Sequence, residues 1–279
     1  MTFRRFTSAG KLLEHVKEKL EVEEAKHSLP LGILANLIKT ENPGDETQSG
    51  DAPFLAANDR GTMTLIQTPP WNLIAAGSPE DVPAAVEWLK DSGASFPGIT
   101  GEKELVKAFI QELNPENASV FMRQRIYRLD EVNPLPRQKG TFGKAEHGDL
   151  DLVTDWVMQF SEQALTPTSK EEARELAEHS ISENRLYLWK NEEGTPVSMA
   201  KKARETAHGA SVNLVFTPDE YKRQGYATSC VAALSELLLS EGFHFCSLYT
   251  DLDNPVSNSI YTKIGYRPVA DSVDYRFNA

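Results

Sequence analysis

Basic residues are scarce relative to acidic ones in this chain of 279 residues. It has 29 lysines and arginines against 41 aspartates and glutamates, so its formal net charge is −12 at pH 7. An acidic chain lacks the positive surface that binds phosphate backbones regardless of sequence. We therefore expect no nucleic acid among its partners.

Cysteine is also scarce, and long apolar runs are missing. The two cysteines, Cys230 and Cys246, have no metal-ligand spacing, so the sequence predicts neither a disulfide framework nor a metal site. The most apolar run, residues 230–239, is interrupted by Ser235 and Glu236. It is far shorter than the ~20 residues that span a bilayer. Since the amino terminus shows no secretory signal either, we expect a cytoplasmic chain without a membrane partner.

What remains is the composition of a folded globular protein, with 40% hydrophobic and 25% charged residues. Two prolines, two basic residues and a glycine mark residues 134–140 as a linker. The sequence therefore predicts an N-terminal domain over residues 1–133 and a C-terminal domain over residues 141–279. A polar stretch over residues 40–51 is expected to be a surface loop.

Apolar periodicity and capping signals predict an α/β fold, in which helices flank a central mixed sheet. In the second half we predict strands at residues 140–144, 186–189, 196–202, 210–216, 244–249, 266–269 and 274–277, and helices from about residue 149 and at 169–179, 226–239 and 256–264. In the first half we predict strands at 2–6, 54–57, 61–67, 72–76, 97–100 and 119–129, and helices at 10–20, 25–38, 81–92 and 102–113. Ser169 and Glu172 have the spacing of a capping box. The two halves run in parallel, which favours a degenerate internal duplication; an unrelated α/β module in the first half is the alternative.

One turn in the second half carries a pattern typical of anion binding. A predicted strand leads into Lys222, Arg223 and Gln224, and Gly225 then opens an apolar helix that contains Ala227. A helix start presents unpaired N–H groups and the positive end of a dipole, and a glycine lets a ligand approach the backbone. The turn therefore indicates a pyrophosphate or similar anion. The alternative is an ordinary solvated turn; the glycines of a dinucleotide fingerprint and of a P-loop are missing.

A second segment, some thirty residues on, makes the pattern specific. Asn254, Tyr261, Gly265 and Tyr266 follow the next predicted strand in order. Together the two segments resemble the acyl-CoA-binding signature of the GNAT family of N-acetyltransferases. The turn resembles the family's Arg/Gln-x-x-Gly-x-Gly/Ala loop, with Lys222 where arginine or glutamine is usual. The resemblance covers roughly residues 141–277 and implies tandem GNAT-like domains with a splayed central sheet.

The resemblance also implies roles for individual residues. Backbone groups of Val215, Phe216 and Thr217 would pair with the pantetheine arm of acetyl-CoA. The pyrophosphate would be held by Lys222, Arg223, Gln224, Gly225, Tyr226, Ala227 and Thr228. Asn254 would bond the pantetheine, with Ser257 and Asn258 near the nucleotide or the arm, and Tyr261 would sit beside the thioester sulfur.

Tyr261 is a chemically reasonable acid, because a phenol with a pKa near ~10 is protonated at neutral pH and can donate to a departing thiolate. A half-buried helix aromatic is the alternative. For Asn254 the alternative is a helix N-cap before Pro255. The general base is open: Asp251 and Asp253 follow the predicted strand, and Glu220 is further off.

The corresponding turn of the first half, residues 77–81, has a glycine but two acids and no cation, so it would repel a pyrophosphate. We therefore expect that only the second half holds the donor. The predicted function is an acyltransferase that moves an acetyl group from acetyl-CoA to a primary amine, either a small molecule or a peptide N-terminus. The alternatives are transfer of a longer acyl or an aminoacyl group, and acyl-CoA binding without turnover. The oligomeric state stays open.

Overall fold

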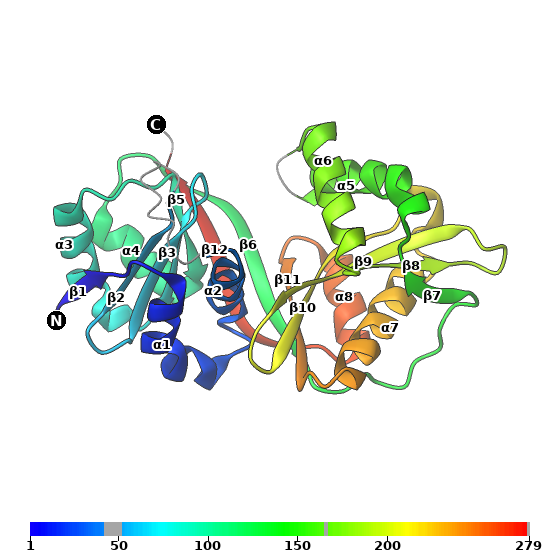
Figure 1. The fold of residues 1–279 in the computed structure, drawn as a ribbon, viewed down its shortest axis with the longest axis horizontal. Coiled ribbons are helices and arrows are strands. Elements are labelled where there is room, and N and C mark those ends of the chain that lie inside the picture. The colour runs from blue at the N-terminus through cyan, green and yellow to red at the C-terminus, as the bar shows by residue number, and fades with distance from the viewer. Residues whose placement is uncertain (42–51, 165–166, 278–279) are drawn as a thin grey trace. The chain divides into compact units, whose positions relative to one another are not determined.

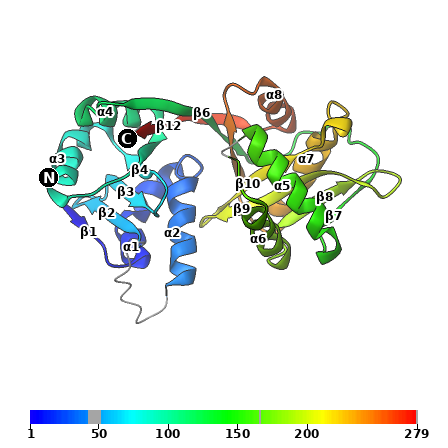
Figure 2. The same ribbon diagram turned by 90° about the horizontal axis from the view of Figure 1, so that it is seen from above.

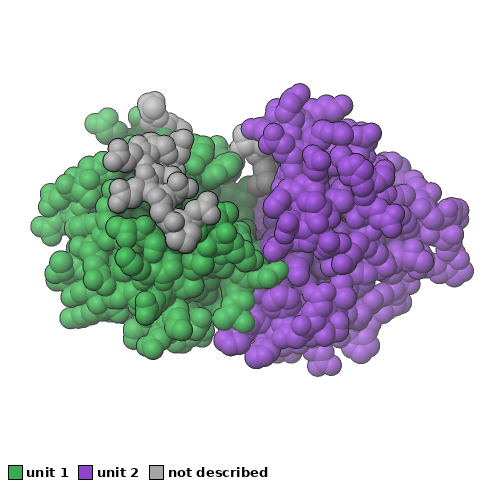
Figure 3. Space-filling view, viewed as in Figure 1, with its two compact units in different colours: residues 1–126, 204–207, 268–279 green, residues 127–203, 208–267 purple. Residues whose placement is uncertain are grey.

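A computed structural model describes residues 1–41, 52–164 and 167–277, so most of the predicted loop at residues 40–51 lies outside the described residues. The chain forms two compact units (Figure 3). Unit 1 contains residues 1–126, 204–207 and 268–279, and unit 2 contains residues 127–203 and 208–267. This division differs from the predicted one at residue 133, since residues 127–133 fold with the second half and residues 268–277 fold with the first.

Unit 1 is a mixed sheet with helices on both faces (Figure 1). Its strands are β1 (Phe3–Arg5), β2 (Phe54–Asn58), β3 (Met63–Gln67), β4 (Leu73–Gly77), β5 (Gly98–Glu102), β6 (Ala118–Leu129) and, from the end of the chain, β12 (Arg267–Phe277). Its helices are α1 (Ala9–Leu20), α2 (Ser28–Thr40), α3 (Val82–Ser92) and α4 (Lys103–Leu113). The strand order is β1-β2-β3-β4-β5-β12-β6. β4 and β5 are parallel, and β12 pairs antiparallel with β5.

Alternate side chains of the unit 1 strands form two separate cores, as the pleat of a strand requires. In β2, Leu55 and Ala57 pack with α1 and α2, whereas Ala56 packs with α3 and α4. Figure 2 shows these two helix pairs on opposite faces of the sheet. Gly93 ends α3 in the left-handed conformation (φ 65°), directly after the last residue of the helix predicted at 81–92.

Unit 2 repeats this arrangement. Its strands are β7 (Thr141–Lys144), β8 (Leu186–Lys190), β9 (Pro196–Glu205), β10 (Gly209–Phe216) and β11 (Phe245–Asp251), in the order β11-β10-β9-β8-β7, and the last residues of β6 belong to this unit. Its helices are α5 (Leu150–Ala164), α6 (Lys170–Ser182), α7 (Tyr226–Ser240) and α8 (Pro255–Ile264). In β8, Leu186 and Leu188 pack with α5 and α6, whereas Tyr187 and Trp189 pack with α7 and α8.

The predicted tandem organisation is confirmed by the order of elements. Each half runs strand, two helices, three strands, helix, strand, helix, strand, when single turns of 3-10 helix are left aside. The predicted capping box of α6 is also present, because Ser169 Oγ accepts from the Glu172 amide and Glu172 Oε2 accepts from the Ser169 amide.

The prediction of two strands at residues 266–269 and 274–277 is wrong, because β12 is one continuous strand. The polar residues Asp271 and Ser272 lie between the two predicted strands, and both side chains find partners within unit 1. Arg125 Nε donates to Asp271 Oδ1 at 2.7 Å, and Ser272 Oγ donates to the Gly101 carbonyl at 2.9 Å. These partners are more than 140 residues away in the chain, so a local pattern does not reveal them.

Candidate functional site

The central strands of unit 2 separate at their carboxyl ends. β10 pairs with β11 in parallel over only three residues each, from Gly209 opposite Phe245 to Ser211 opposite Ser247. Beyond that point β10 continues to Phe216 and β11 to Asp251, but the two strands no longer share a register. The separation agrees with the splay that the family resemblance implies.

Leu214 marks the separation, because it lies inside β10 with a φ of 48°. A left-handed conformation is costly for leucine, and within a strand it redirects the backbone in the manner of a β-bulge. Its side chain is 7% exposed and packs into the core with α5 and α6. Sequence reasoning missed this feature because no residue that favours positive φ stands there.

The end of β10 is held by its own side chains. Thr217 Oγ1 donates to Ser198 Oγ at 2.9 Å, and Ser198 Oγ donates to the Phe216 carbonyl at 3.1 Å. The ring of Phe216 packs against Trp156, with their centroids 5.9 Å apart. Since Phe216 and Thr217 bury their side chains, a ligand at this strand end meets backbone rather than side chains. The half-buried Val215 packs against the other core, beside α7.

The turn before α7 has the backbone of an anion cradle. Arg223 and Gly225 have positive φ angles of 63° and 87°. The first amide bonded inside the helix belongs to Ser229, which donates to the Gly225 carbonyl at 3.0 Å. The amides of Tyr226, Ala227 and Thr228 precede it and have no helical carbonyl four residues back. These N–H groups and the helix dipole suit a phosphate group.

Two side chains of this turn already form contacts within the protein. Lys222 Nζ lies 2.6 Å from Asp219 Oδ1 and donates to Gln163 Oε1 at 3.1 Å, and Gln224 Nε2 donates to the Glu220 carbonyl at 2.9 Å. Arg223 is exposed. Arg223 is therefore the cation of the turn that can reach a ligand without first losing an ion pair.

Gly225 also faces a segment that sequence reasoning did not connect with the turn. A Cβ atom on Gly225 would lie 3.0 Å from Gln138 Nε2. The backbone N–H of Gln138 donates to Ser229 Oγ at 2.9 Å. A hydrogen bond thus joins the predicted linker, residues 134–140, to the first turn of α7.

The start of α8 is capped by the residues that were predicted to bind the donor. Asn254 Oδ1 accepts from the Ser257 amide at 3.1 Å, and Pro255 occupies the first turn. Asn258 Nδ2 donates to the carbonyls of Asp251 and Asn254 at 3.0 and 2.8 Å. The capping alternative for the Asn254 side chain is therefore observed. A role of Asn254, Ser257 and Asn258 in binding the donor stays a prediction.

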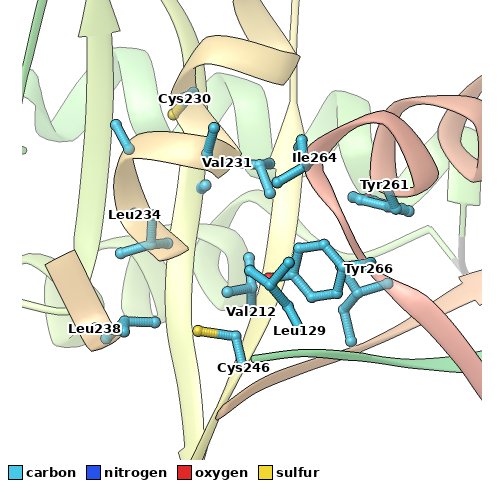
Figure 4. Close-up of a cluster of buried hydrophobic side chains, with 14 of the residues drawn as sticks. Leu129, Val212, Cys230, Val231, Leu234, Leu238, Cys246, Tyr261, Ile264 and Tyr266 are labelled. Carbon is cyan, nitrogen blue, oxygen red and sulfur yellow. The ribbon is translucent and has the colours of Figure 1, made fainter. Parts of the chain in front are cut away.

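Tyr261 lies on the inner face of α8, among the buried residues that Figure 4 shows. Its side chain is 8% exposed, and burial raises its pKa to about 12. Its ring stands 6.0 Å from that of Tyr266 and 6.3 Å from that of Tyr127, measured between centroids. Tyr266 is further inside, and its hydroxyl shares a hydrogen bond of 2.8 Å with Ser235 Oγ.

The structure adds little support to any candidate base. Asp251 Oδ1 accepts from the Asp253 amide at 2.9 Å, so this carboxylate stabilises the turn between β11 and α8. Asp253 and Glu220 are exposed. The rings of His208 and His244 stack on each other with centroids 5.1 Å apart. Asp251 stays the predicted base by its position at the end of β11.

The corresponding turn of unit 1 is closed by its own residues. Gly77 approaches β3 so closely that a Cβ there would lie 2.1 Å from the Thr62 carbonyl oxygen. Ser78 caps the 3-10 turn Pro79–Asp81 that precedes α3. The buried Asp81 accepts hydrogen bonds from Asn58 Nδ2 at 2.9 Å and from Thr62 Oγ1 at 2.5 Å. A carboxylate at a helix start takes the place that an anion would need.

Over residues 1–41, 52–164 and 167–277, no group of three or more histidines, cysteines and acidic residues could hold a metal ion. In the same part of the chain, no helix has the length and apolar character that crossing a membrane requires.

The chain is similar to known proteins in sequence over its second half and in fold over its whole length. A family model described as "FR47-like protein" matches residues 193–275, a range that contains every predicted site residue. No curated protein matches the chain significantly. Many solved structures share its fold. An acetyltransferase of the GNAT family from Colwellia psychrerythraea has a TM-score of 0.62 at 12% identity, and the match covers 100% of both chains.

Two further solved structures share this fold. A GCN5-related N-acetyltransferase from Sphaerobacter thermophilus has a TM-score of 0.64 at 13% identity, over 99% of this chain and 94% of that one. A tandem GNAT protein from the clavulanic acid biosynthesis pathway has a TM-score of 0.57 at 12% identity, over 98% and 97%. The chain therefore has the fold of the GNAT family, in its tandem form.

Proposed function

We propose that this protein is an acyl-CoA-dependent N-acyltransferase that moves an acetyl group from acetyl-CoA to a primary amine, carried by a small molecule or a peptide N-terminus. The observation that carries the proposal is the separation of β10 from β11 beside the start of α7. An opened strand edge suits the amides of a pantetheine arm, and the cradle at Gly225 suits a pyrophosphate.

The donor supplies a thioester, whose carbonyl carbon an amine can attack and whose leaving group is a thiolate. On this chain, the backbone of Val215, Phe216 and Thr217 would orient the arm. The amides of Tyr226, Ala227 and Thr228 would hold the pyrophosphate, with Arg223 adding charge. In unit 1 the corresponding turn, residues 77–81, has the buried carboxylate of Asp81 at the place where an anion would bind.

Tyr261 would donate a hydrogen bond from its hydroxyl to the leaving sulfur. With its pKa at about 12, complete proton transfer to a thiolate with a conjugate pKa of ~8.5 would cost on the order of 5 kcal/mol. The role that this geometry supports is therefore stabilisation of the developing charge by a hydrogen bond. Asp251, directly or through water, would take the proton of the amine.

The test is calorimetric titration of the protein with acetyl-CoA, CoA and pantetheine, followed by measurement of CoA release with a panel of primary amines. We expect acetyl-CoA and CoA to bind, pantetheine to bind much more weakly because it has no pyrophosphate, and at least one amine to accelerate CoA release. Binding without release for any amine would favour a non-catalytic acyl-CoA-binding protein. Faster turnover with longer acyl donors would favour the longer-chain alternative, and absence of binding would overturn the proposal.

A further inference from the structure

Tyr127 connects the last strand of the first half with the helix that carries Tyr261. It lies near the end of β6, belongs to unit 2 and is 4% exposed. Its hydroxyl donates to Asn258 Oδ1 at 3.1 Å. Its ring centroid is 6.3 Å from that of Tyr261, at an interplanar angle of 53°. One side chain thus contacts two residues of α8.

These two contacts restrain the orientation of α8. Asn258 and Tyr261 are three residues apart, so they lie on one face of the helix, a single turn from each other. A contact at one point would leave the helix free to rotate about it. A hydrogen bond at Asn258 and a ring contact at Tyr261 restrict both rotation and sliding of the helix.

Asn258 completes the connection on its other side. Its Nδ2 donates to the carbonyl of Asp251, at the end of β11, and to that of Asn254. Its carbonyl oxygen accepts from Tyr127, so donor and acceptor groups of the amide are both in use. The amide therefore joins β6, β11 and α8 at one point, which is a positioning role.

The orientation of the Tyr261 hydroxyl depends on the residues that pack against its ring. Its hydroxyl has no hydrogen-bond partner among the described residues, whereas that of Tyr266 is bonded to Ser235. The direction of the Tyr261 hydroxyl is therefore set by how its ring is packed. Its ring lies against those of Tyr127 and Tyr266, and Tyr127 comes from outside the α8–β12 segment.

We infer that Tyr127 is a positioning residue for Tyr261 and that it acts through its hydrogen bond to Asn258. The inference rests on the proposed function, because it assigns Tyr261 to the reaction. It also gives a role in acyl transfer to the end of β6, which folds with unit 2. The role is to orient Tyr261, which would donate a hydrogen bond to the leaving sulfur.

The test is the variant Tyr127→Phe, which keeps the ring and removes the hydroxyl. We expect kcat for acetyl transfer to fall about 3- to 30-fold, while KM for acetyl-CoA changes less than about 2-fold, because a displaced hydroxyl weakens only transition-state contacts. Asn258→Ala removes the same bond from the other side and should lower kcat by a similar factor. The matched control is Tyr187→Phe, which changes a buried tyrosine of the same unit whose ring stacks on Phe142.

A double-mutant cycle separates positioning from general destabilisation. If Tyr127 acts through Tyr261, Tyr127→Phe has no further effect on kcat in a Tyr261→Phe background. Independent, multiplicative losses would overturn the inference, and so would a wild-type kcat in Tyr127→Phe. Amide hydrogen exchange gives a readout that needs no turnover: we expect faster exchange in α8 for Tyr127→Phe and unchanged exchange for Tyr187→Phe. If the wild-type protein transfers no acetyl group, the proposed function fails, and the positioning role fails with it; the exchange data then report the contact alone.

Discussion

Lys222 Nζ lies 2.6 Å from Asp219 Oδ1 in the turn that leads to α7. Lys222 occupies the position where the family resemblance places a ligand-binding arginine or glutamine. The ion pair is partly exposed, with 43% of the lysine side chain and 82% of the aspartate side chain accessible. Exposed pairs of this kind are worth ~0.2–1 kcal/mol, so a ligand phosphate can compete with Asp219 for the lysine.

Removing this competitor should strengthen donor binding. Asp219→Asn leaves the backbone of the turn intact and frees the ammonium group, so we expect CoA to bind about 2- to 5-fold more tightly at low salt. Calorimetry at two salt concentrations is the measurement, and the gain should shrink at high salt because exposed charges are screened. Weaker CoA binding in Asp219→Asn would show that Asp219 supports the turn instead.

Arg223 should contribute more than Lys222 does, because it is exposed and already held in the left-handed conformation at the cradle. We expect Arg223→Ala to weaken CoA binding by roughly 10-fold, the size of one charge-assisted hydrogen bond. Arg174→Ala removes an exposed arginine that pairs with Asp151 on α5, far along the chain from the turn, and serves as the control. Equal effects of the two variants would mean that net charge, and not the cradle, governs binding.

Tyr261→Phe should lower kcat by about 10- to 10³-fold and change CoA affinity little, because the lost hydrogen bond forms at the leaving sulfur. The raised pKa of about 12 also predicts a pH profile. Between pH 7 and 10 the phenol stays protonated, so no loss of kcat in this range should trace to Tyr261. A wild-type kcat that falls with an apparent pKa near 10, and does not do so in Tyr261→Phe, would contradict the burial of this group.

The two thiols should be unreactive in the folded protein. Burial raises the pKa of Cys230 and of Cys246 to about 12. Only about 10⁻⁴ of each is then thiolate at pH 8, so iodoacetamide should label neither thiol until denaturant is added. In the unfolded chain a thiol has a pKa of ~8.5 and loses its proton first. The free energy of unfolding should therefore fall as pH rises from about 8.5 toward 12. Rapid labelling of the native protein would contradict this.

Two aspartates of β12 should respond oppositely to the same substitution. Burial raises the pKa of Asp274, against the hydrogen bonds from Thr100 and Asn72, so its ionised form costs free energy at neutral pH. The hydrogen bond and charge of Arg125 instead lower the pKa of Asp271. We therefore expect Asp274→Asn to raise Tm at pH 7 and Asp271→Asn to lower it, as measured by calorimetry.

The pH dependence of these two effects provides the check. The penalty of Asp274 develops as pH rises from the unfolded pKa through the higher folded one, whereas the contribution of Asp271 is lost as pH falls through its lowered folded pKa. At pH 3 both variants should approach the Tm of the wild-type protein. A Tm difference for Asp274→Asn that is larger at pH 3 than at pH 7 would contradict the assignment.

Features that depend on neighbours in the chain were predictable. The capping box of Ser169 and Glu172, the stop at Gly93 and the cap of α8 at Asn254 each involve residues within a few positions, so the pattern itself carries the physics. The repeated order of elements was equally readable, because apolar periodicity shows each element separately. The glycine turn before α7 and the residues of α8 also stand where the sequence predicts them.

Features that depend on partners far along the chain were decided by the tertiary structure. Leu214 adopts a positive φ that nothing in its own sequence favours. β12 is one strand in unit 1 because Asp271 and Ser272 find Arg125 and Gly101 there. Tyr127 reaches Asn258 across 131 residues, and a contact of that separation leaves no mark in local periodicity. The sequence by itself thus determined which elements form and where the cradle lies, while packing decided which strands meet and how Tyr261 is oriented.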